Sequence, residues 1–171
     1  MIFDFNSTSN NKNWRIVNDD VMGGISTSSF SINSDGNGVF EGHVSLENYG
    51  GFSSVRYQSK NITIENCNSF QMRIKGDGKS YQFRIRSSLS DSHTYKFTFK
   101  TDKTWQIITI PFIHLSPTFR GRDLRIPNIN GDKVEEVGFL ISNKKEEDFQ
   151  LEIDYIKSIY CLIGILSKFE R

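Results

Sequence analysis

Alternation of apolar and polar side chains with a period of two is the dominant pattern of this chain. In the ranges 70–75, 81–86, 95–100 and 149–155, aromatic and aliphatic residues alternate with charged or polar ones. Because successive side chains of a β-strand point to opposite faces, each range predicts a strand with one face in a core and the other in water. Less regular β-branched and aromatic runs predict further strands, about ten in all. These runs are 25–32, 39–46, 52–57, 105–112 and 137–142.

Turn signals between these ranges indicate a sandwich or a barrel. Gly76-Asp77-Gly78 separates two alternating ranges and Asp35-Gly36-Asn37-Gly38 precedes another, so both predict tight hairpin turns. The chain also has 14 Phe, 6 Tyr and 2 Trp among its 171 residues, which suits a core filled by strand side chains. A chain of this length supports one such core, so we expect a single all-β sandwich domain over residues 1–160.

Two segments depart from the strand pattern. Residues 116–136 contain Pro117 and Pro127 and are expected to form a long loop across one end of the sandwich. Residues 161–171 are expected to form a C-terminal tail. The apolar stretch that enters this tail is far below the ~20 residues that span a bilayer, so we expect no transmembrane segment. A last strand or a docked tail is the leading interpretation, and contact with a membrane surface is the alternative.

The charges of the chain nearly cancel. Lys and Arg total 21 against 20 Asp and Glu, which gives a formal net charge of +1. Such a chain has no overall field that would attract a nucleic acid, so no nucleic-acid partner is expected. The N-terminus, Met1-Ile2-Phe3-Asp4-Phe5, has neither the apolar run of a signal peptide nor the Arg-rich pattern of a transit peptide. This predicts a cytoplasmic location.

Residues that usually bind metals or cofactors are scattered. The histidines lie in separate segments without metal-ligand spacing, at His43, His93 and His114. The segment from Gly76 to Ser80 ends like a phosphate-binding loop, but a strand pattern follows it where that loop requires a helix. We therefore predict no metal and no other cofactor.

Catalytic signatures are also missing. Gly24-Ile25-Ser26-Thr27-Ser28 lacks the second glycine of a nucleophile elbow. Asp19 and Asp20 could act with Glu41 or Glu47 as the acid and base of a glycosidase, but nothing in the sequence places these carboxylates face to face. We predict a protein that is not an enzyme.

The segment from Trp14 to Gly24 is the most unusual in the chain. A polar triplet, Asn18-Asp19-Asp20, precedes Val21-Met22-Gly23-Gly24, and two adjacent glycines lose much backbone entropy on folding. One hypothesis is a partner or ligand site made by Trp14, Asn18, Asp19, Asp20, Met22, Gly23 and Gly24. The other is a structural turn, in which the glycines form a bulge and Asn18 and Asp20 cap it through bonds to backbone N–H groups.

Arginines form a second constellation. Arg73, Arg84 and Arg86 occupy polar strand positions, and Arg120 and Arg122 lie in the predicted long loop. The planar guanidinium suits carboxylates and phosphates, so clustered arginines could bind an anionic partner. Alternatively, Glu152 and Asp154 on a neighbouring strand neutralise the strand arginines.

A series of spaced motifs resembles the complex I intermediate-associated protein 30 family. The motifs are Trp14 to Gly24 with Ser26, Phe40-Glu41-Gly42, Val44-Ser45-Leu46, Gly50 to Arg56, Asp77 to Arg86, Trp105, Ile110-Pro111-Phe112, Phe119 to Arg122, Val137 to Ile141 and Leu151 to Ile156. The resemblance covers nearly the whole chain up to Ile156. It implies a jelly-roll sandwich of the galactose-binding type and a role as a non-enzymatic, chaperone-like assembly factor of NADH:ubiquinone oxidoreductase.

Three functional hypotheses follow. The leading one is a protein-interaction or assembly module, with a protein partner such as a respiratory-chain subunit. It would use an edge of the sandwich formed by the 18–24 loop and the 119–122 loop. The rival is a carbohydrate-binding module that holds a sugar with Trp14, Tyr49 and Arg84, since jelly rolls commonly bind sugars on aromatic platforms. An enzyme of another type is a third and weaker hypothesis.

Overall fold

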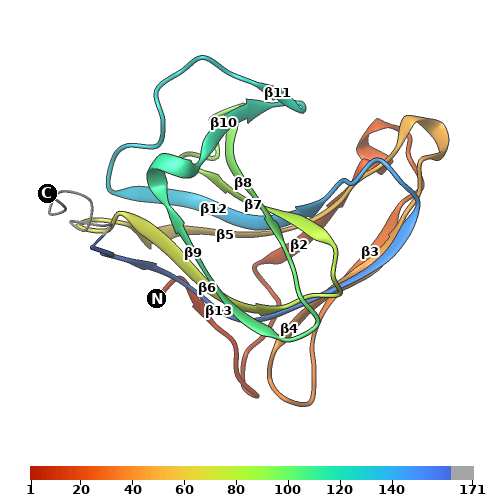
Figure 1. Cartoon of the computed structure of the whole chain (residues 1–171), viewed down its shortest axis with the longest axis horizontal. Helices are drawn as coiled ribbons and strands as arrows, with labels where there is room; N and C mark the ends of the chain where they lie inside the picture. Colours follow the sequence, from red (N-terminus) through yellow and green to blue (C-terminus); the bar gives the residue numbers. More distant parts are fainter. Residues whose placement is uncertain (163–171) are drawn as a thin grey trace, which may run out of the picture.

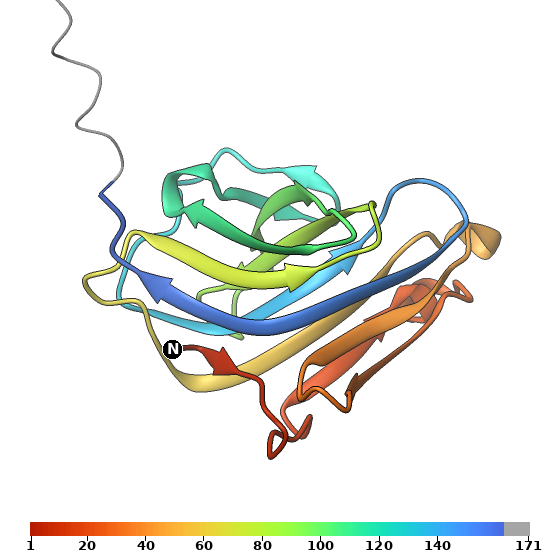
Figure 2. The ribbon, with the colours of Figure 1, turned by 60° about the horizontal axis from the view of Figure 1, so that its bottom comes forward.

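Residues 1–162, the part of the chain that the computed structural model describes, form two facing antiparallel sheets (Figures 1 and 2). One sheet has, in spatial order, β3 (Thr27–Ile32), β4 (Gly38–Val44), β13 (Glu147–Ile159), β6 (Ser69–Lys75) and β9 (Trp105–Pro111), with β1 (Phe3–Asp4) also paired to β13. The other has β11 (Arg122–Asp123), β10 (Ser116–Phe119), β8 (Thr94–Lys100), β7 (Ser80–Arg86), β12 (Lys133–Ile141), β5 (Ser53–Thr63) and β2 (Trp14–Asn18). The predicted all-β sandwich of the jelly-roll, galactose-binding type is confirmed.

Short 3-10 turns are the helical elements among residues 1–162. They are η1 (Asp19–Met22), η2 (Glu47–Tyr49) and η3 (Phe112–His114). No helix among these residues is long and apolar enough to cross a membrane.

The predicted alternation appears directly as burial. Along β7 the residues alternate between buried and half-buried, and Tyr81, Phe83 and Ile85 are each 1% exposed or less. They meet residues of the six-stranded sheet, and Phe70 packs against Phe83 with ring centroids 5.4 Å apart. Each fully buried large side chain of this kind stabilises the fold by roughly 1.5–3 kcal/mol, so the shared interior holds the two layers together.

The 116–136 segment differs from its prediction as a plain loop. It contains β10, which pairs with β8, and β11, which pairs only with β10. Pro117 is tolerated there because β10 lies next to the edge of the sheet, where only the two residues of β11 cover it. The stretch from Leu124 to Asp132 is irregular as expected, whereas Lys133 to Glu136, also predicted as loop, belong to β12.

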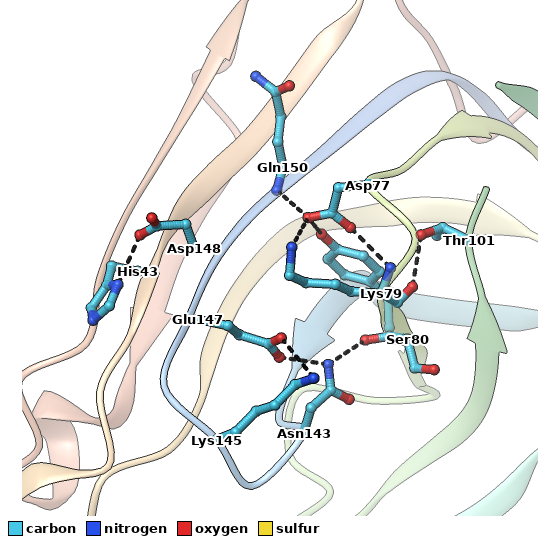
Figure 3. Close-up of polar contacts among 11 residues, drawn as sticks. His43, Asp77, Lys79, Ser80, Thr101, Asn143, Lys145, Glu147, Asp148 and Gln150 are labelled. Atoms are coloured by element: carbon cyan, nitrogen blue, oxygen red, sulfur yellow. Dashed lines mark hydrogen bonds and ion pairs between the residues drawn. The ribbon is translucent and has the colours of Figure 1, made fainter. Parts of the chain in front are cut away.

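A partly buried polar network lies at one end of the sandwich (Figure 3). One Asp77 oxygen accepts hydrogen bonds from the Tyr81 hydroxyl at 3.1 Å and from the Gln150 N–H at 2.9 Å. Nearby, the amide of Asn143 donates to the Glu147 carboxylate at 2.8 Å and to the Ser80 carbonyl at 3.1 Å. Asp77 therefore ties the 76–79 turn, which precedes β7, to β13, and Asn143 ties the β12–β13 connection to the first residues of β7 and β13. Asp77 has a structural role in this turn.

The strand β13 ends at Ile159. Residues 163–171, which make up most of the predicted tail, lie outside the described part of the chain. The division into a domain over 1–160 and a tail over 161–171 stays a prediction.

Candidate functional site

Asp19 anchors the loop that the sequence singled out. Its side chain is buried, with 1% exposure for the residue, and both carboxylate oxygens accept hydrogen bonds. Oδ1 accepts from the Ser26 N–H at 3.0 Å. Oδ2 accepts from the Ser26 hydroxyl at 2.5 Å, from the Gly51 N–H at 2.6 Å and from the Phe52 N–H at 3.3 Å. One carboxylate thus fastens the 18–24 loop to the segment that follows η2.

These hydrogen bonds also set the ionisation of Asp19. Burial raises the pKa of the carboxyl, but the donors from Ser26, Gly51 and Phe52 together outweigh burial, and the net pKa lies below the ordinary 3.8. Asp19 is therefore a buried anion at neutral pH. Its hydrogen-bonding capacity is used within the protein, so it is not free to act as a catalytic acid or base.

The glycines of this loop have separate structural reasons. Gly23 has φ = 89° and forms the left-handed end of η1. At Gly24 a Cβ atom would lie 2.4 Å from Cγ of Asp19, so only glycine lets the backbone pass the buried carboxylate. The close approach predicted for this segment is thus made by the chain itself.

The remaining polar residues divide between interior and surface. Asn18 is buried, accepts a hydrogen bond from the Ser28 hydroxyl at 2.8 Å and donates to the Ser26 carbonyl at 3.4 Å. The turn hypothesis named Asn18 and Asp20 as the capping residues, but neither side chain caps η1. Asp19 holds the loop in their place, while Asp20 is exposed. The backbone part of this segment is structural, and its tip is free to make contacts.

Large apolar side chains stand exposed on this tip and on its neighbour. The loops around η1 and η2 lie side by side in both views of the ribbon (Figures 1 and 2). Together they form what we term the apolar corner, made of Val21 (68% exposed), Met22 (69%), Ile25 (48%), Leu46 (43%) and Tyr49 (100%). The sequence placed Met22 and Tyr49 in separate hypotheses, because the loops around η1 and η2 become neighbours only through the Asp19 hydrogen bonds.

The backbone of η2 holds Tyr49 outward in a strained conformation. Asn48 and Tyr49 have φ values of 55° and 59°, a left-handed conformation that non-glycine residues rarely adopt. Gly50 and Gly51 follow directly, and the latter donates to Asp19. A strained turn that presents a fully exposed ring is typical of a contact site.

The 119–122 turn lies elsewhere. Arg120, with φ = 49°, and Gly121 connect β10 to β11, and the Arg120 guanidinium lies 5.2 Å from the Phe119 ring centroid. Because β11 and β2 are at opposite edges of the seven-stranded sheet, this turn and the 18–24 loop do not form one edge of the sandwich. The prediction that Arg120 and Arg122 share a contact edge with Asp20 is wrong in this respect.

The strand arginines separate between the two sheets. Arg73, on β6, pairs with Asp154 at 2.7 Å, and the neighbouring Lys75 pairs with Glu152 at 3.1 Å, so the predicted neutralisation occurs on the six-stranded sheet. Arg84 and Arg86 lie on β7 of the other sheet. Arg86 contacts Glu136 at 3.4 Å, whereas Arg84 forms no ion pair with any residue of 1–162.

Arg84 is part of a line of cations that crosses the seven-stranded sheet. The register places Lys96 opposite Arg84, Arg84 opposite Gly138, Gly138 opposite Arg56 and Arg56 opposite Arg15. We term Arg15, Arg56, Arg84 and Lys96 the cation row, with Gly138 at its middle. The sequence argument missed Arg15, Arg56 and Lys96, because only the strand order brings these positions together.

A small, shallow hollow, open to solvent, lies at the middle of the cation row. Its lining includes Arg56, Arg84, Thr94, Glu136, Gly138 and Leu140. Gly138 has a structural reason as well, since a Cβ there would lie 2.4 Å from the Val55 carbonyl oxygen. The bottom of the hollow between Arg56 and Arg84 is therefore formed by backbone that has no side chain.

Residues 3–153 match the family described as "Complex I intermediate-associated protein 30 (CIA30)". The chain belongs to this family. Among its relatives is "Probable complex I intermediate-associated protein 30, mitochondrial" of Caenorhabditis elegans, 30% identical over 170 residues, with 84% of this chain and 49% of the relative covered. Another is "Uncharacterized protein C9E9.15" of Schizosaccharomyces pombe, 28% identical over 171 residues, with 86% and 78% covered. The chain spans about half the length of the Caenorhabditis relatives that it matches.

Names within the CIA30 family correct one prediction. The Caenorhabditis elegans relative and the mouse protein "Complex I intermediate-associated protein 30, mitochondrial", which is 31% identical over 97 residues, both have a mitochondrial designation. The mouse alignment covers 52% of this chain and 29% of that protein. The cytoplasmic location predicted from the N-terminus is therefore wrong. Its physical argument failed because residues Met1 to Phe5 already belong to the domain, with β1 paired to β13, so their pattern reports on the fold and not on targeting.

Solved structures place the CIA30 domain beside carbohydrate-binding modules in fold. The family 11 module of the cellulosomal cellulase Lic26A-Cel5E of Clostridium thermocellum has a TM-score of 0.70 at 17% identity, with 96% of each chain covered. A carbohydrate-binding module of family 29 has a TM-score of 0.53 at 10% identity, with 93% of this chain and 86% of that one covered. At such identities the likeness shows the fold alone.

The sugar platform proposed from the sequence does not assemble in this CIA30 domain. Trp14 is 7% exposed and packs against Phe30, with ring centroids 4.7 Å apart, so it belongs to the core. Tyr49 lies on the apolar corner and Arg84 in the middle of the seven-stranded sheet. The three side chains are therefore not on one surface.

Histidines and carboxylates were the side chains considered for metal binding and acid–base chemistry in the CIA30 domain. His43 contacts Asp148 at 2.8 Å on the surface of the six-stranded sheet. Residues 1–162 contain no group of three or more His, Cys, Asp or Glu placed to hold a metal ion. Of the carboxylates considered for a glycosidase, Asp19 is committed to its four donors and Glu41 accepts from Gln150 at 2.9 Å.

Proposed function

We propose that this domain is a non-catalytic protein-interaction module that assists assembly of respiratory complex I. It would act in mitochondria, in line with the names of its relatives. The family match supports the assembly role, and the apolar corner supports protein contact as the means. Its partners would be subunits or assembly intermediates of the respiratory chain.

The observation that carries the proposal is the exposure of five large apolar side chains on two rigidly joined loops. Exposed apolar residues gathered in one place are typical of protein-contact sites, whereas single ones are ordinary. Here Tyr49 and Met22 belong to residue types enriched in interfaces. The Asp19 hydrogen bonds hold both loops in place before binding, which lowers the entropy lost when a partner docks.

A replacement experiment tests the corner. The gene that encodes this chain would be deleted in its own organism and supplied again as wild type or as the triple variant Val21→Ser, Met22→Ser, Tyr49→Ser. We expect the triple variant to leave complex I subassemblies on native gels and to lower NADH-dependent respiration several-fold, because an interface loses most of its affinity with its central apolar contacts.

The matched control removes exposed apolar surface elsewhere. Ile107 and Ile113 are 60% and 73% exposed, on β9 and η3, so Ile107→Ser with Ile113→Ser changes a comparable surface away from the corner. This control is expected to support complex I assembly as the wild type does. Full assembly with the triple variant, or equal defects in triple variant and control at equal protein levels, would overturn the proposal.

Carbohydrate binding has support only from the fold. All aromatic rings of β2, β5, β7, β8 and β12, in the described residues, belong to the core side of the seven-stranded sheet. Its outer face therefore offers no ring from these strands on which a sugar could stack. A glycan array that gave sugar-specific binding, lost with Tyr49→Ser, would favour this rival over the assembly role.

A further inference from the structure

The charged side chains on the outer faces of the two sheets are arranged differently. On the six-stranded sheet, Arg73 and Lys75 each have a carboxylate partner on the adjacent β13. On the seven-stranded sheet, the cation row places side chains of like charge at directly opposed positions of neighbouring strands. Like charges in this arrangement repel and destabilise a sheet. The row thus contrasts with the Arg73 and Lys75 pairs of the six-stranded sheet.

Compensation for the row within residues 1–162 is slight. Lys96 contacts Asp123 at 3.3 Å, but the Asp123 side chain is 77% exposed, and exposed pairs contribute little. Glu136 contacts Arg86, which lies one position beyond the row. Arg15, Arg56 and Arg84 form no ion pair in this part of the chain. Three guanidinium groups of the described residues therefore lie on this face without an ion-pair partner, and Glu136, the carboxylate whose charge acts on Arg56, is already paired with Arg86.

Partial burial increases the cost of this arrangement. Burial and the charge of Arg56 lower the pKa of Arg84 to about 10. Burial also lowers the pKa of Arg56, against the attraction of Glu136 and with the repulsion of Arg86 and Arg15. The two arginines border the hollow above Gly138. The middle of the row is where an added anion would gain most.

The length of the row suggests the form of that anion. Neighbouring strands lie about 4.8 Å apart, so Arg15 and Arg84, three strands apart in the sheet order, are separated by roughly 14 Å. An extended peptide places every second side chain about 6.8 Å further on, so three alternate carboxylates span roughly the same length. Guanidinium groups bind carboxylates through paired hydrogen bonds.

We infer that the cation row is a binding site for an extended acidic segment of a protein partner, with alternate Glu or Asp carboxylates at Arg15, Arg56 and Arg84. The site is separate from the apolar corner and does not depend on it. A nucleic acid fits less well, because the strands of this face direct their aromatic rings into the core, away from any base.

The test uses the whole chain and a labelled peptide that alternates Ser and Glu, compared with the same peptide carrying Gln for Glu. Fluorescence anisotropy at about 50 mM salt should show binding of the Glu peptide, which falls steeply as salt rises. The double variant Arg56→Gln, Arg84→Gln should bind about tenfold more weakly or worse. The Gln peptide should bind neither protein.

A matched variant separates the site from general charge. Arg120→Gln with Arg122→Gln removes the same two positive charges from the exposed β10–β11 turn and should change affinity less than about twofold. The triple variant of the apolar corner should bind the peptide as the wild type does, so failure of one proposal does not imply failure of the other. Thermal melts of all variants would verify folding.

Three results would overturn the inference. One is equal binding of the Glu and Gln peptides. The second is equal loss of binding in the two double-arginine variants. The third is tighter binding of a short single-stranded RNA than of the Glu peptide, with the same dependence on Arg56 and Arg84.

Discussion

Replacing Asp19 by asparagine keeps the size of the side chain but removes its charge and one hydrogen-bond acceptor. In the wild type, Oδ2 accepts three hydrogen bonds and Oδ1 accepts one. An asparagine that retains the oxygen at the Oδ2 position must turn its amide NH₂ toward the Ser26 N–H, which places donor against donor. The other orientation keeps the Ser26 N–H bond but turns the NH₂ group toward the Gly51 and Phe52 N–H groups, so both of those bonds are lost. The variant therefore cannot satisfy the buried donors in either orientation.

The expected loss follows from these bonds. Hydrogen bonds to a charged group contribute about 1.5–3 kcal/mol each and those to a neutral group about 1, and a buried N–H without an acceptor costs about 1–3. Since the bonds share one carboxylate and do not add fully, we expect Asp19→Asn to lower the free energy of unfolding by about 3 to 5 kcal/mol. For a domain of this size, that corresponds to a drop in Tm of roughly 6 to 20 °C.

Urea titration followed by the fluorescence of the buried Trp14 measures this loss. The pKa of Asp19 is lowered in the fold, so its contribution is present above about pH 4 and disappears as pH falls through the folded-state pKa. The difference in free energy of unfolding between wild type and Asp19→Asn should accordingly become smaller at acidic pH. Asp20→Asn is the matched control, because this neighbouring carboxylate is exposed, and it should change stability by less than about 0.5 kcal/mol. If Asp19→Asn lowered the free energy of unfolding no more than Asp20→Asn, the structural role of the Asp19 carboxylate would be refuted.

Tyr81→Phe removes the hydroxyl that donates to Asp77 and should cost about 1–2 kcal/mol in the same titration. Burial, together with the charge of Asp77, raises the pKa of Tyr81. The free energy of unfolding of the wild type should therefore fall as pH rises above about 10, and that of Tyr81→Phe should fall less. The same dependence of stability on alkaline pH in both proteins would contradict this. Arg84→Met removes a partly buried charge without an ion-pair partner in residues 1–162 and should raise the free energy of unfolding at pH 7 by about 1 kcal/mol. A loss of stability of that size would show that Arg84 serves the fold.

The strands were predictable because the pattern that encodes them is local. Residues 70–75, 81–86, 95–100 and 149–155 alternate in sequence, and each lies within a strand, because side-chain direction in a strand depends only on position. The strands β10 and β11 were not predictable in this way. They are four and two residues long, and β10 exists only because β8 supplies the pairing partner from a distant part of the chain.

The sequence indicated the 18–24 segment as unusual, but it did not indicate the role of each residue in it. Asn18, Asp19 and Asp20 are three consecutive polar residues, and nothing local tells which of them turns inward. The choice depends on Gly51, whose N–H lies 32 residues away in sequence. The cation row has the same limit, since Arg15 and Lys96 lie in distant parts of the sequence and share a line only through the order β2, β5, β12, β7, β8.

Stability and binding measured on the same Arg84 variant separate two explanations of the cation row. If the row were a structural feature, its arginines would stabilise the sheet, as the Arg73 pair with Asp154 does on the opposite face. If it serves a ligand, the free domain retains a repulsion that only an added anion relieves, so losing Arg84 should raise stability and lower affinity for the acidic peptide together. A rise in stability with a fall in affinity would favour the ligand explanation only together with the control, since Arg120→Gln with Arg122→Gln removes the same charge elsewhere and should leave affinity for the peptide nearly unchanged.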